Sequence, residues 1–434
     1  MSKQIRYSTE PEDFYYMDIN VPCQGACPVA TNIPAYIRCL FEERYGRSYE
    51  INHVANILPG VLGRICSRPC EDKCRHGEAE LGRPVKICHI KRAAADFREK
   101  ATFSEKGPVT SLDKAVAIIG AGPAGLAAAH DLSSVGFSVT LYEALAKAGG
   151  MLRYGIPEFR LPRAILDAEI QYIQDMGTLV KTGVRVGKDL SVRDLLGDYD
   201  AVLLAAGCYR SIALDIPGET LPGVYMGLDF MMDVCGGRAP VLGDRVLVVG
   251  AGFTAFDCAR SALRLGAADV RICLRRTEED LMVTRDEILE AKKEGVKIES
   301  LMLSRHIVGD KKLEGVAFVR TEPGEKRADG KREVKAIEGS GFVLPADTLI
   351  VAVGQRPEPM DITGEKVTQG LPLPDRSTLR SSVKGLYMAG DYVSGPSTVI
   401  EAIGMGRRAA ERIAEDLTGR RFREKVVRLE DTET

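Results

Sequence analysis

The stretch AVAIIGAGPAG, residues 115–125, decides the fold, because it joins an apolar strand to a glycine-rich turn and the start of a helix. Gly120, Gly122 and Gly125 follow the spacing G-x-G-x-x-G, and a second strand ends at Glu143. In this pattern the first glycine makes a tight turn, the second lets backbone amides reach a pyrophosphate, and the third lets the helix pack on the strand. The stretch therefore predicts a dinucleotide-binding βαβ unit.

A second copy of this unit occurs later in the chain. The apolar strand 245–249 leads into Gly250 and Gly252, with Ala255 in the place of the third glycine, and a further strand runs over 269–276. A lone G-x-G-x-x-G is weak evidence, but here each copy follows a strand and opens a helix. Together with the alternating strands and helices after residue 111, the two copies predict an α/β fold with two Rossmann-like three-layer domains.

The ends of the second strands indicate which ligand each unit binds. Glu143 is a hydrogen-bond acceptor placed for a ribose with free hydroxyls, which fits the adenosine of FAD or NAD. Arg275 and Arg276 stand at the corresponding place in the second copy and would bind the 2′-phosphate of NADP(H). The first unit is thus expected to bind FAD and the second NADP(H), with NAD(H) as the alternative if the arginines are only a solvated surface pair.

Composition excludes several classes of protein. Among 434 residues, 59 basic side chains nearly balance 61 acidic ones, so no basic footprint for nucleic acid is present. No apolar run approaches the roughly 20 residues that a membrane span needs. We therefore expect a cytoplasmic protein without nucleic acid partners and without a membrane span.

The cysteines are concentrated near the N-terminus. Seven of the eleven fall within the first 88 residues, namely Cys23, Cys27, Cys39, Cys66, Cys70, Cys74 and Cys88. Because no secretory leader is recognisable, such clustering favours metal or cluster ligands over disulfides. Spacing alone leaves zinc and iron–sulfur open, but a neighbouring flavin favours a [4Fe-4S] cluster, since zinc carries no electrons. This region is expected to be helical, with helices over 33–45 and 84–98, and to end at a linker over 105–108.

Further motifs give the chain a family resemblance. It resembles the flavoproteins with two dinucleotide-binding domains, and among them the small (beta) subunit of NADPH-dependent glutamate synthase; related modules occur in dihydropyrimidine dehydrogenase and in bifurcating NADH-dependent ferredoxin:NADP oxidoreductases. Besides the two glycine turns, the resemblance rests on the motifs PCxxxCP (22–28), GRICxxxCxxxC (63–74), GGMLxxGIPxFRL (149–161) and GLYMAGD (385–391).

The resemblance implies a domain plan. A helical [4Fe-4S]-binding domain covers residues 1–110, the FAD-binding domain covers 111–238 and 355–425, the NAD(P)H-binding domain is inserted over 239–354, and a tail follows over 426–434. It also implies that Asp391 binds the ribityl chain and that a helix beginning near Ser397 points its positive end at the flavin. The other cofactor-binding residues that it implies are Pro123, Ala124, Gly150, Met151, Leu152, Gly155, Ile156, Arg160, Gly207, Phe253, Thr254, Asp257, Gly354, Gly390, Thr398 and Val399.

The resemblance also implies cluster ligands, with departures. Cys27, Cys66 and Cys70 match ligand positions of the family's inner cluster, whereas the fourth position falls near Lys91, whose ammonium cannot ligate. Cys88, one helical turn earlier, is the expected replacement. For the outer cluster two ligands are missing, since residues 18–22 hold no cysteine. Cys23 and Cys74 would then form a second site or be remnants of one, and Cys39 is expected to be a buried helix residue.

The expected mechanism is hydride transfer from NAD(P)H to FAD, followed by single-electron transfer through the cluster to a redox partner subunit or a ferredoxin. No side-chain acid, base or nucleophile is needed. A thioredoxin-reductase-type enzyme is disfavoured, because no two cysteines after residue 100 are close in sequence. The alternative from another class is a flavin-containing redox sensor or docking protein whose N-terminal module binds zinc.

Overall fold

The computed structural model describes residues 21–78, 82–98, 111–281, 283–326, 332–361, 374–375 and 377–420, and all structural statements below refer to these ranges. The expected linker at 105–108 and the expected tail at 426–434 lie outside them. The chain divides into two compact units. Unit 1 comprises residues 1–152, 160–207 and 359–434, and unit 2 comprises residues 153–159 and 208–358.

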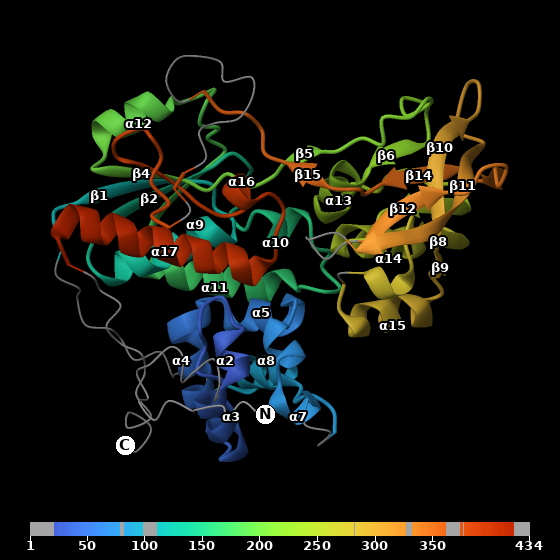
Figure 1. The fold of residues 1–434 in the computed structure, drawn as a ribbon. Coiled ribbons are helices and arrows are strands. Elements are labelled where there is room, and N and C mark those ends of the chain that lie inside the picture. The colour runs from blue at the N-terminus through green and yellow to red at the C-terminus, as the bar shows by residue number, and fades with distance from the viewer. Residues whose placement is uncertain are drawn as a thin grey trace, which may run out of the picture. The chain divides into compact units, whose positions relative to one another are not determined.

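The N-terminal part of unit 1 is helical in its described residues, 21–78 and 82–98 (Figure 1). Its helices are α2 (Pro22–Gly25), α3 (Ile33–Phe41), α4 (Tyr45–Asn56), α5 (Pro59–Ile65), α6 (Pro69–Asp72), α7 (Arg75–Glu78) and α8 (Ile87–Phe97). The helix expected over 33–45 instead ends at Phe41, because Glu43 adopts a positive φ of 58° and a new helix begins at Tyr45. The helix expected over 84–98 begins only at Ile87.

The rest of unit 1 is built on a five-stranded parallel sheet. Its order is β16 (Leu386–Met388), β4 (Ala201–Leu204), β1 (Ala115–Ile119), β2 (Ser138–Glu143) and β3 (Leu179–Thr182). The helices of this part are α9 (Pro123–Ser134), α11 (Arg163–Asp175), α12 (Val192–Asp198), α16 (Asp391–Ser394) and α17 (Val399–Thr418), while α10 (Met151–Tyr154) spans the boundary between the units. Strands β1 and β4 are almost wholly buried apolar runs, as expected for a parallel sheet covered on both faces.

Unit 2 repeats this architecture. Its parallel sheet has the order β6 (Val224–Met226), β14 (Thr348–Val351), β7 (Arg245–Val249), β8 (Asp269–Cys273) and β9 (Lys297–Glu299). Its helices are α13 (Gly227–Cys235), α14 (Phe253–Arg264), the 3₁₀ turn η1 (Glu278–Asp280) and α15 (Arg285–Glu294). Residues 208–238, which the sequence analysis places with the first domain, lie in unit 2, because β6 extends the second sheet by pairing with β14.

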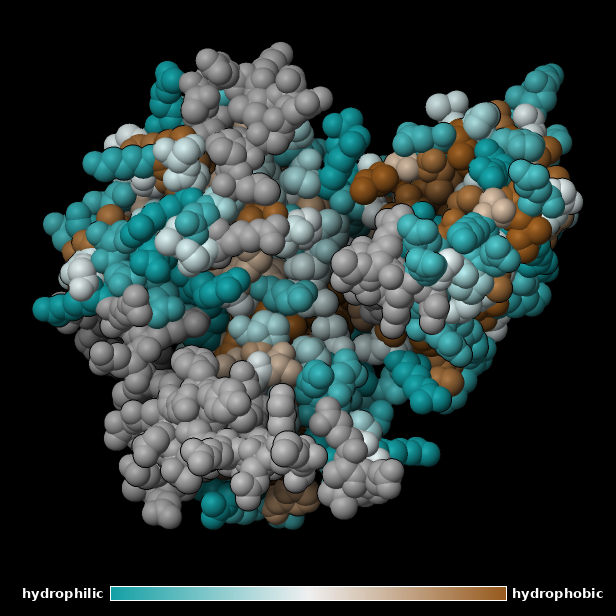
Figure 2. All heavy atoms as spheres, viewed as in Figure 1, coloured by the Kyte–Doolittle hydropathy of each residue, from teal (hydrophilic) through white to brown (hydrophobic). Residues whose placement is uncertain are grey.

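Unit 2 also holds two smaller sheets. Strands β10 (Met302–Val308), β11 (Gly315–Lys326), β12 (Arg332–Ala336) and β13 (Phe342–Pro345) form an antiparallel sheet, and β5 (Arg210–Ser211) pairs with β15 (Gln355–Arg356). Figure 2 shows apolar side chains gathered over β10 and β11. Among the helices of the described ranges, none is long and apolar enough to cross a membrane.

Two helices that are far apart in sequence pack closely in unit 1. Helix α17 lies against α9 (Figure 1), and a Cβ added at Gly406 would stand 2.1 Å from the carbonyl oxygen of Ala124. Only a glycine permits this backbone approach. The contact joins the helix after the first glycine turn to the last helix of the described chain.

We predict that Gly406→Ala destabilises the protein by about 1–3 kcal/mol, because the new methyl group must push α17 away from α9. The matched control is Gly197→Ala in α12, where an added Cβ would meet nothing within 4 Å. Denaturant titrations followed by circular dichroism measure both. Equal unfolding free energies for the two variants would contradict the prediction.

Candidate functional site

The first glycine turn lies where the sheet of unit 1 reverses its winding, between β1 and β4. Gly120 has a φ of +104°, and a Cβ there would stand 2.5 Å from the carbonyl oxygen of Ala205. At Gly125 a Cβ would stand 1.9 Å from the carbonyl oxygen of Gly120. Both positions therefore require glycine, and the turn lies at the crevice where open α/β sheets bind ligands.

The start of α9 offers donors to an anion. Gly122 is the N-cap and Pro123, which has no N–H, is the first helical residue. Within the described part of the chain, the amides of Ala124 and Gly125 have no hydrogen-bond acceptor. Free amides at the positive end of a twelve-residue helix suit a phosphate group.

Glu143 lies at the end of β2, beside this turn. Its Oε2 accepts a hydrogen bond from the amide of Ala121 at 2.9 Å, and its Oε1 accepts one from the amide of Leu145 at 2.9 Å. Burial raises the pKa of Glu143, and these amide bonds oppose the rise. Each carboxylate oxygen has a second lone pair, so the side chain can also accept a ribose hydroxyl.

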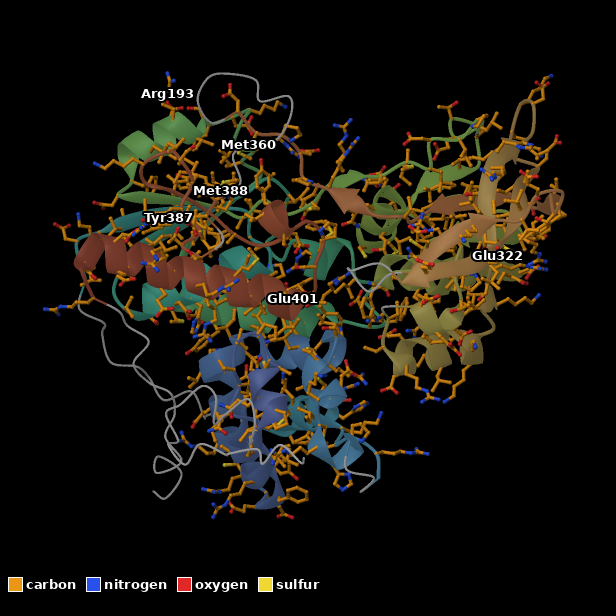
Figure 3. The ribbon with its side chains drawn as sticks, in the orientation of Figure 1. Arg193, Glu322, Met360, Tyr387, Met388 and Glu401 are labelled. Atoms are coloured by element: carbon orange, nitrogen blue, oxygen red, sulfur yellow. The ribbon has the colours of Figure 1, made fainter. Side chains whose placement is uncertain are left out.

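The start of α17 is the second set of donors in unit 1. Thr398 caps the helix, and Glu401, labelled in Figure 3, completes a capping box with it. The box satisfies the amides of Thr398 and Glu401, whereas those of Val399 and Ile400 have no acceptor among the described residues. Two amides at the N-terminus of a twenty-residue helix thus remain for an external acceptor.

Asp391 precedes this helix, at the start of α16. Its Oδ1 accepts a hydrogen bond from the hydroxyl of Ser397 at 2.6 Å, and burial raises its pKa. Gly390 before it has a φ of +69°, and a Cβ there would stand 2.8 Å from the Cβ of Ala124. The loop before α17 therefore lies directly beside the start of α9.

The other predicted cofactor residues fall in both units. Gly150 faces the turn, since a Cβ at Gly122 would stand 3.9 Å from its Cα. Gly150, Met151, Leu152, Arg160 and Gly207 belong to unit 1, whereas Gly155 and Ile156 belong to unit 2. The carbonyl of Ile156 accepts a hydrogen bond from the thiol of Cys235 at 3.5 Å, so this part of the motif is attached to α13.

The second glycine turn repeats the first within unit 2. A Cβ at Gly250 would stand 2.3 Å from the carbonyl oxygen of Ala352, which follows the neighbouring strand β14. Gly252 caps α14, whose first turn holds Phe253, Thr254 and Ala255, with Asp257 buried behind them. After β8, Arg275 is exposed and Arg276 half-buried, and Gly354 follows β14 with a φ of +142°. The turn and the arginines thus meet at the carboxyl ends of neighbouring strands.

Four cysteines gather in the helical region. Cys27, Cys66, Cys70 and Cys88 are each at most 9% exposed. The side chain of Cys66 contacts that of Cys88, and this contact, followed in size by burial, raises the pKa of Cys66. The side chain of Cys88 also contacts that of Cys70. The structure therefore brings Cys66, Cys70 and Cys88 together, from the end of α5, α6 and the start of α8, while Cys27, just after α2, lies near Lys91 together with them.

Lys91 lies one turn after Cys88 on α8 and is only 3% exposed. Burial disfavours its charge, but the nearby cysteines Cys88, Cys66, Cys27 and Cys70 outweigh burial and raise the pKa of the ammonium. Lys91 is therefore a cation among the four cysteines. Four buried cysteines around one ammonium group fit the donor set of a [4Fe-4S] cluster, whose cysteine ligands bind as thiolates.

The remaining cysteines of this region separate into two kinds. Cys23 is half-buried and lies near Cys74. Burial of Cys23 raises its pKa most, and the nearby Cys74 raises it further. Cys39 is buried in α3, as expected for a structural residue. Over the described ranges, no group of three or more His, Cys, Asp or Glu is arranged to hold a single metal ion.

Sequence reasoning missed a buried carboxylate that joins the two parts of unit 1. Glu169 of α11 is 4% exposed, and its Oε1 accepts hydrogen bonds from the amide of Gly60 at 2.6 Å and the hydroxyl of Tyr49 at 3.1 Å. Its Oε2 accepts one from the amide of Val61 at 3.0 Å. A charged residue in the apolar stripe of Leu166, Ile170 and Ile173 was the signal that could have revealed it.

Sequence reasoning also missed an ion pair deep in unit 1. Arg407 of α17 donates from Nε to Oδ2 of Asp131 on α9 at 2.8 Å. Its Nη1 donates to the carbonyl of Val54 at 2.8 Å and also to that of Ala55. These carbonyls belong to the last turn of α4, where a cation is favourable.

Comparisons with known proteins agree with this architecture. Residues 114–406 match the family model of pyridine nucleotide-disulphide oxidoreductases, and residues 18–103 match a model described as dihydropyrimidine dehydrogenase domain II, 4Fe-4S cluster. The NADP(+)-dependent formate dehydrogenase subunit beta of Moorella thermoacetica is 39% identical over 90% of this chain, which spans 59% of that subunit.

Two further proteins extend the comparison. The glutamate synthase [NADPH] small chain of Escherichia coli is 36% identical, over 91% of this chain and 88% of its own length. Mycobacterium tuberculosis FprA in complex with NADPH has a TM-score of 0.61 at 22% identity, covering 70% of this chain and 85% of FprA, which establishes a shared fold.

We predict that stability depends on pH through Glu169. Burial raises its pKa from 4.5 to about 7, so the folded state retains a proton that the unfolded state releases. The resulting stabilisation is fully present below about pH 4.5 and is lost as the pH rises through about 7, a loss of about 3 kcal/mol.

The glutamine in Glu169→Gln cannot ionise, so the unfolding free energy of this variant should not fall as the pH rises through about 7. Denaturant titrations between pH 4.5 and pH 8 measure it, and Asp175→Asn, an exposed acid on the same helix, should behave like the wild type. The prediction fails if wild type and Glu169→Gln show the same pH dependence.

Proposed function

This chain belongs to the pyridine nucleotide-disulphide oxidoreductase family and, within it, groups with the glutamate synthase small chains; from this membership we propose that it is the electron-input flavoprotein of a redox complex. When bound, FAD takes a hydride from NAD(P)H and releases electrons singly, and a [4Fe-4S] cluster carries them singly to a partner protein. The chain's own residues hold and orient these groups, and no side-chain acid, base or nucleophile is assigned.

One observation carries the proposal. Helices α9 and α17, whose first amides lack acceptors among the described residues, pack on each other, and α17 contacts Pro28 in the region that gathers four cysteines, all within unit 1. A flavin held by the first turn, by Glu143 and by the start of α17 would therefore lie in the same unit as the cluster. This is the arrangement that a hydride-to-single-electron converter needs.

For FAD, we propose that the amides of Ala124 and Gly125 bind the pyrophosphate and that Glu143 binds the adenosine ribose. Asp391 would bind the ribityl chain. The free amides of Val399 and Ile400 would face the flavin edge that gains negative charge on reduction.

For the nicotinamide coenzyme, we propose the turn at Gly250 and Gly252 as the pyrophosphate site. Arg275 and Arg276 follow β8 next to this turn and would bind the 2′-phosphate of NADP(H). For the cluster, we propose Cys27, Cys66, Cys70 and Cys88 as ligands, because they are buried together around Lys91.

The partner is proposed from the kind of protein that the relatives are named as. Both the formate dehydrogenase subunit beta and the glutamate synthase small chain are, by name, parts of larger assemblies. We propose a larger redox subunit or a ferredoxin as the electron acceptor. We also place the protein in the cytoplasm, where a reducing environment keeps cysteine thiolates available for a cluster.

An anaerobic visible spectrum of the purified chain tests this function. Flavin bands over a broad iron–sulfur shoulder, bleached by NADPH, are expected. Cys66→Ser should lose iron and the shoulder while retaining flavin, and Cys39→Ser, a buried cysteine outside the proposed site, should retain both. A colourless N-terminal region containing zinc, beside an ordinary flavin spectrum, would instead support the redox-sensor alternative.

We predict that replacing both Arg275 and Arg276 with alanine weakens NADPH binding by about tenfold or more, because charge-assisted bonds to the 2′-phosphate are lost. Binding of NADH, which lacks this phosphate, should change little. Titration of both coenzymes measures this, with Arg305→Ala, an exposed arginine of β10, as the control. Equal loss of affinity for NADPH and NADH would contradict the assignment.

A further inference from the structure

Two proposed cluster ligands lie next to contacts that helices of the flavin-binding part make with the helical region. The first contact is between α17 and the residue after Cys27. A Cβ added at Gly404 would stand 2.9 Å from the carbonyl oxygen of Pro28 and 3.4 Å from its Cβ. At 1.5 Å per residue, Gly404 lies roughly 8 Å along α17 from Val399. One helix therefore extends from the proposed flavin site to the neighbour of Cys27.

The second contact holds the helix that ends at Cys66. Helix α5 runs from Pro59 to Ile65, and Cys66 is its C-cap. At its other end, Glu169 of α11 accepts the amides of Gly60 and Val61. Helix α5 has only seven residues, so a shift of its first turn moves the whole helix. By holding that turn, Glu169 helps to fix the position of Cys66.

The third contact holds the end of α4, just before the turn that leads into α5. Arg407 of α17 binds the carbonyls of Val54 and Ala55, and Asp131 of α9 binds the same guanidinium. Between the two helices, buried Ile57 has a φ of +52°, a conformation that a β-branched residue rarely adopts. The guanidinium of Arg407 thus holds the carbonyl end of α4, and the carboxyl group of Glu169 holds the amide end of α5, on either side of a strained residue.

We propose that Gly404, Glu169 and Arg407 are positioning residues that set the separation between flavin and cluster. This inference rests on the proposed function. None of these three residues is among those proposed to bind FAD or the nicotinamide coenzyme, so we expect hydride transfer to the flavin to be unaffected. The later step, in which the reduced flavin loses one electron and the cluster gains it, depends steeply on separation. Displacing Pro28 or α5 should therefore slow only that step.

The test is anaerobic stopped-flow of the full chain, loaded with flavin and cluster, mixed with NADPH. In Gly404→Ala the new methyl group must displace Pro28 by several tenths of an ångström. In Glu169→Gln the carboxylate that holds α5 is replaced by a neutral amide. For both, we expect flavin bleaching at the wild-type rate and cluster reduction slowed by about twofold. Arg408→Ala, exposed on α17, is the control and should match the wild type in both phases.

Hydrogen exchange gives a readout that does not depend on turnover. In Glu169→Gln one of the two acceptor oxygens becomes an amide donor, which should speed exchange of the amides of Gly60 and Val61 by about tenfold, with the iron content unchanged. If Gly404→Ala fails to fold, Glu169→Gln and Arg407→Lys decide the question in the same assay.

The outcomes separate the inference from the function on which it rests. Variants that keep their iron and reduce the cluster at the wild-type rate overturn the inference. Loss of iron from the variants, with the control intact, also overturns it, because the residues would then only maintain the fold. Failure of the wild type itself to reduce a cluster with NADPH would instead overturn the proposed function.

Discussion

The close approach of α17 to α9 is the constraint on which the rest of unit 1 depends. Gly406 lets α17 lie against the backbone at Ala124, and Gly390 lets the preceding loop reach the same residue. Because these segments are far apart in sequence, the chain must return to the first sheet after building unit 2. It does so through β16, which pairs with β4. The free amides of the two helices consequently belong to one site.

At the turn between α4 and α5, two buried ionisable side chains bind the backbone groups of the helix ends. Glu169 and Arg407 are both buried, and each compensates for burial by binding backbone groups at a helix end whose partial charge is opposite to its own. Neither is a simple salt bridge across a surface. Removing either side chain would leave unpaired polar groups in the core, a far larger penalty than the loss of an exposed ion pair.

Local patterns made most of the fold predictable from the sequence. Each glycine turn follows an apolar strand and opens a helix within a few residues, so both βαβ units could be recognised, and Glu143 with them. A helix beginning near Ser397 was expected as well, and α17 begins at Val399. Long-range pairs could not be recognised in this way. Glu169 and Arg407 have partners more than a hundred residues away, and β6 joins its sheet beside β14. The cysteine spacing suggested a group, but which thiols meet depends on how four short helices pack.

The positive charge of Lys91 bears on how readily the proposed cluster would be reduced. If Cys27, Cys66, Cys70 and Cys88 bind a [4Fe-4S] cluster as proposed, the cluster is anionic, and an accepted electron adds a further negative charge in a buried, poorly screened place. A fixed positive charge beside it favours the reduced form more than the oxidised form. In the proposed site Lys91 would thereby raise the midpoint potential of the cluster and make its reduction by the flavin more favourable. A single buried lysine would in this way favour electron transfer from the flavin to the cluster.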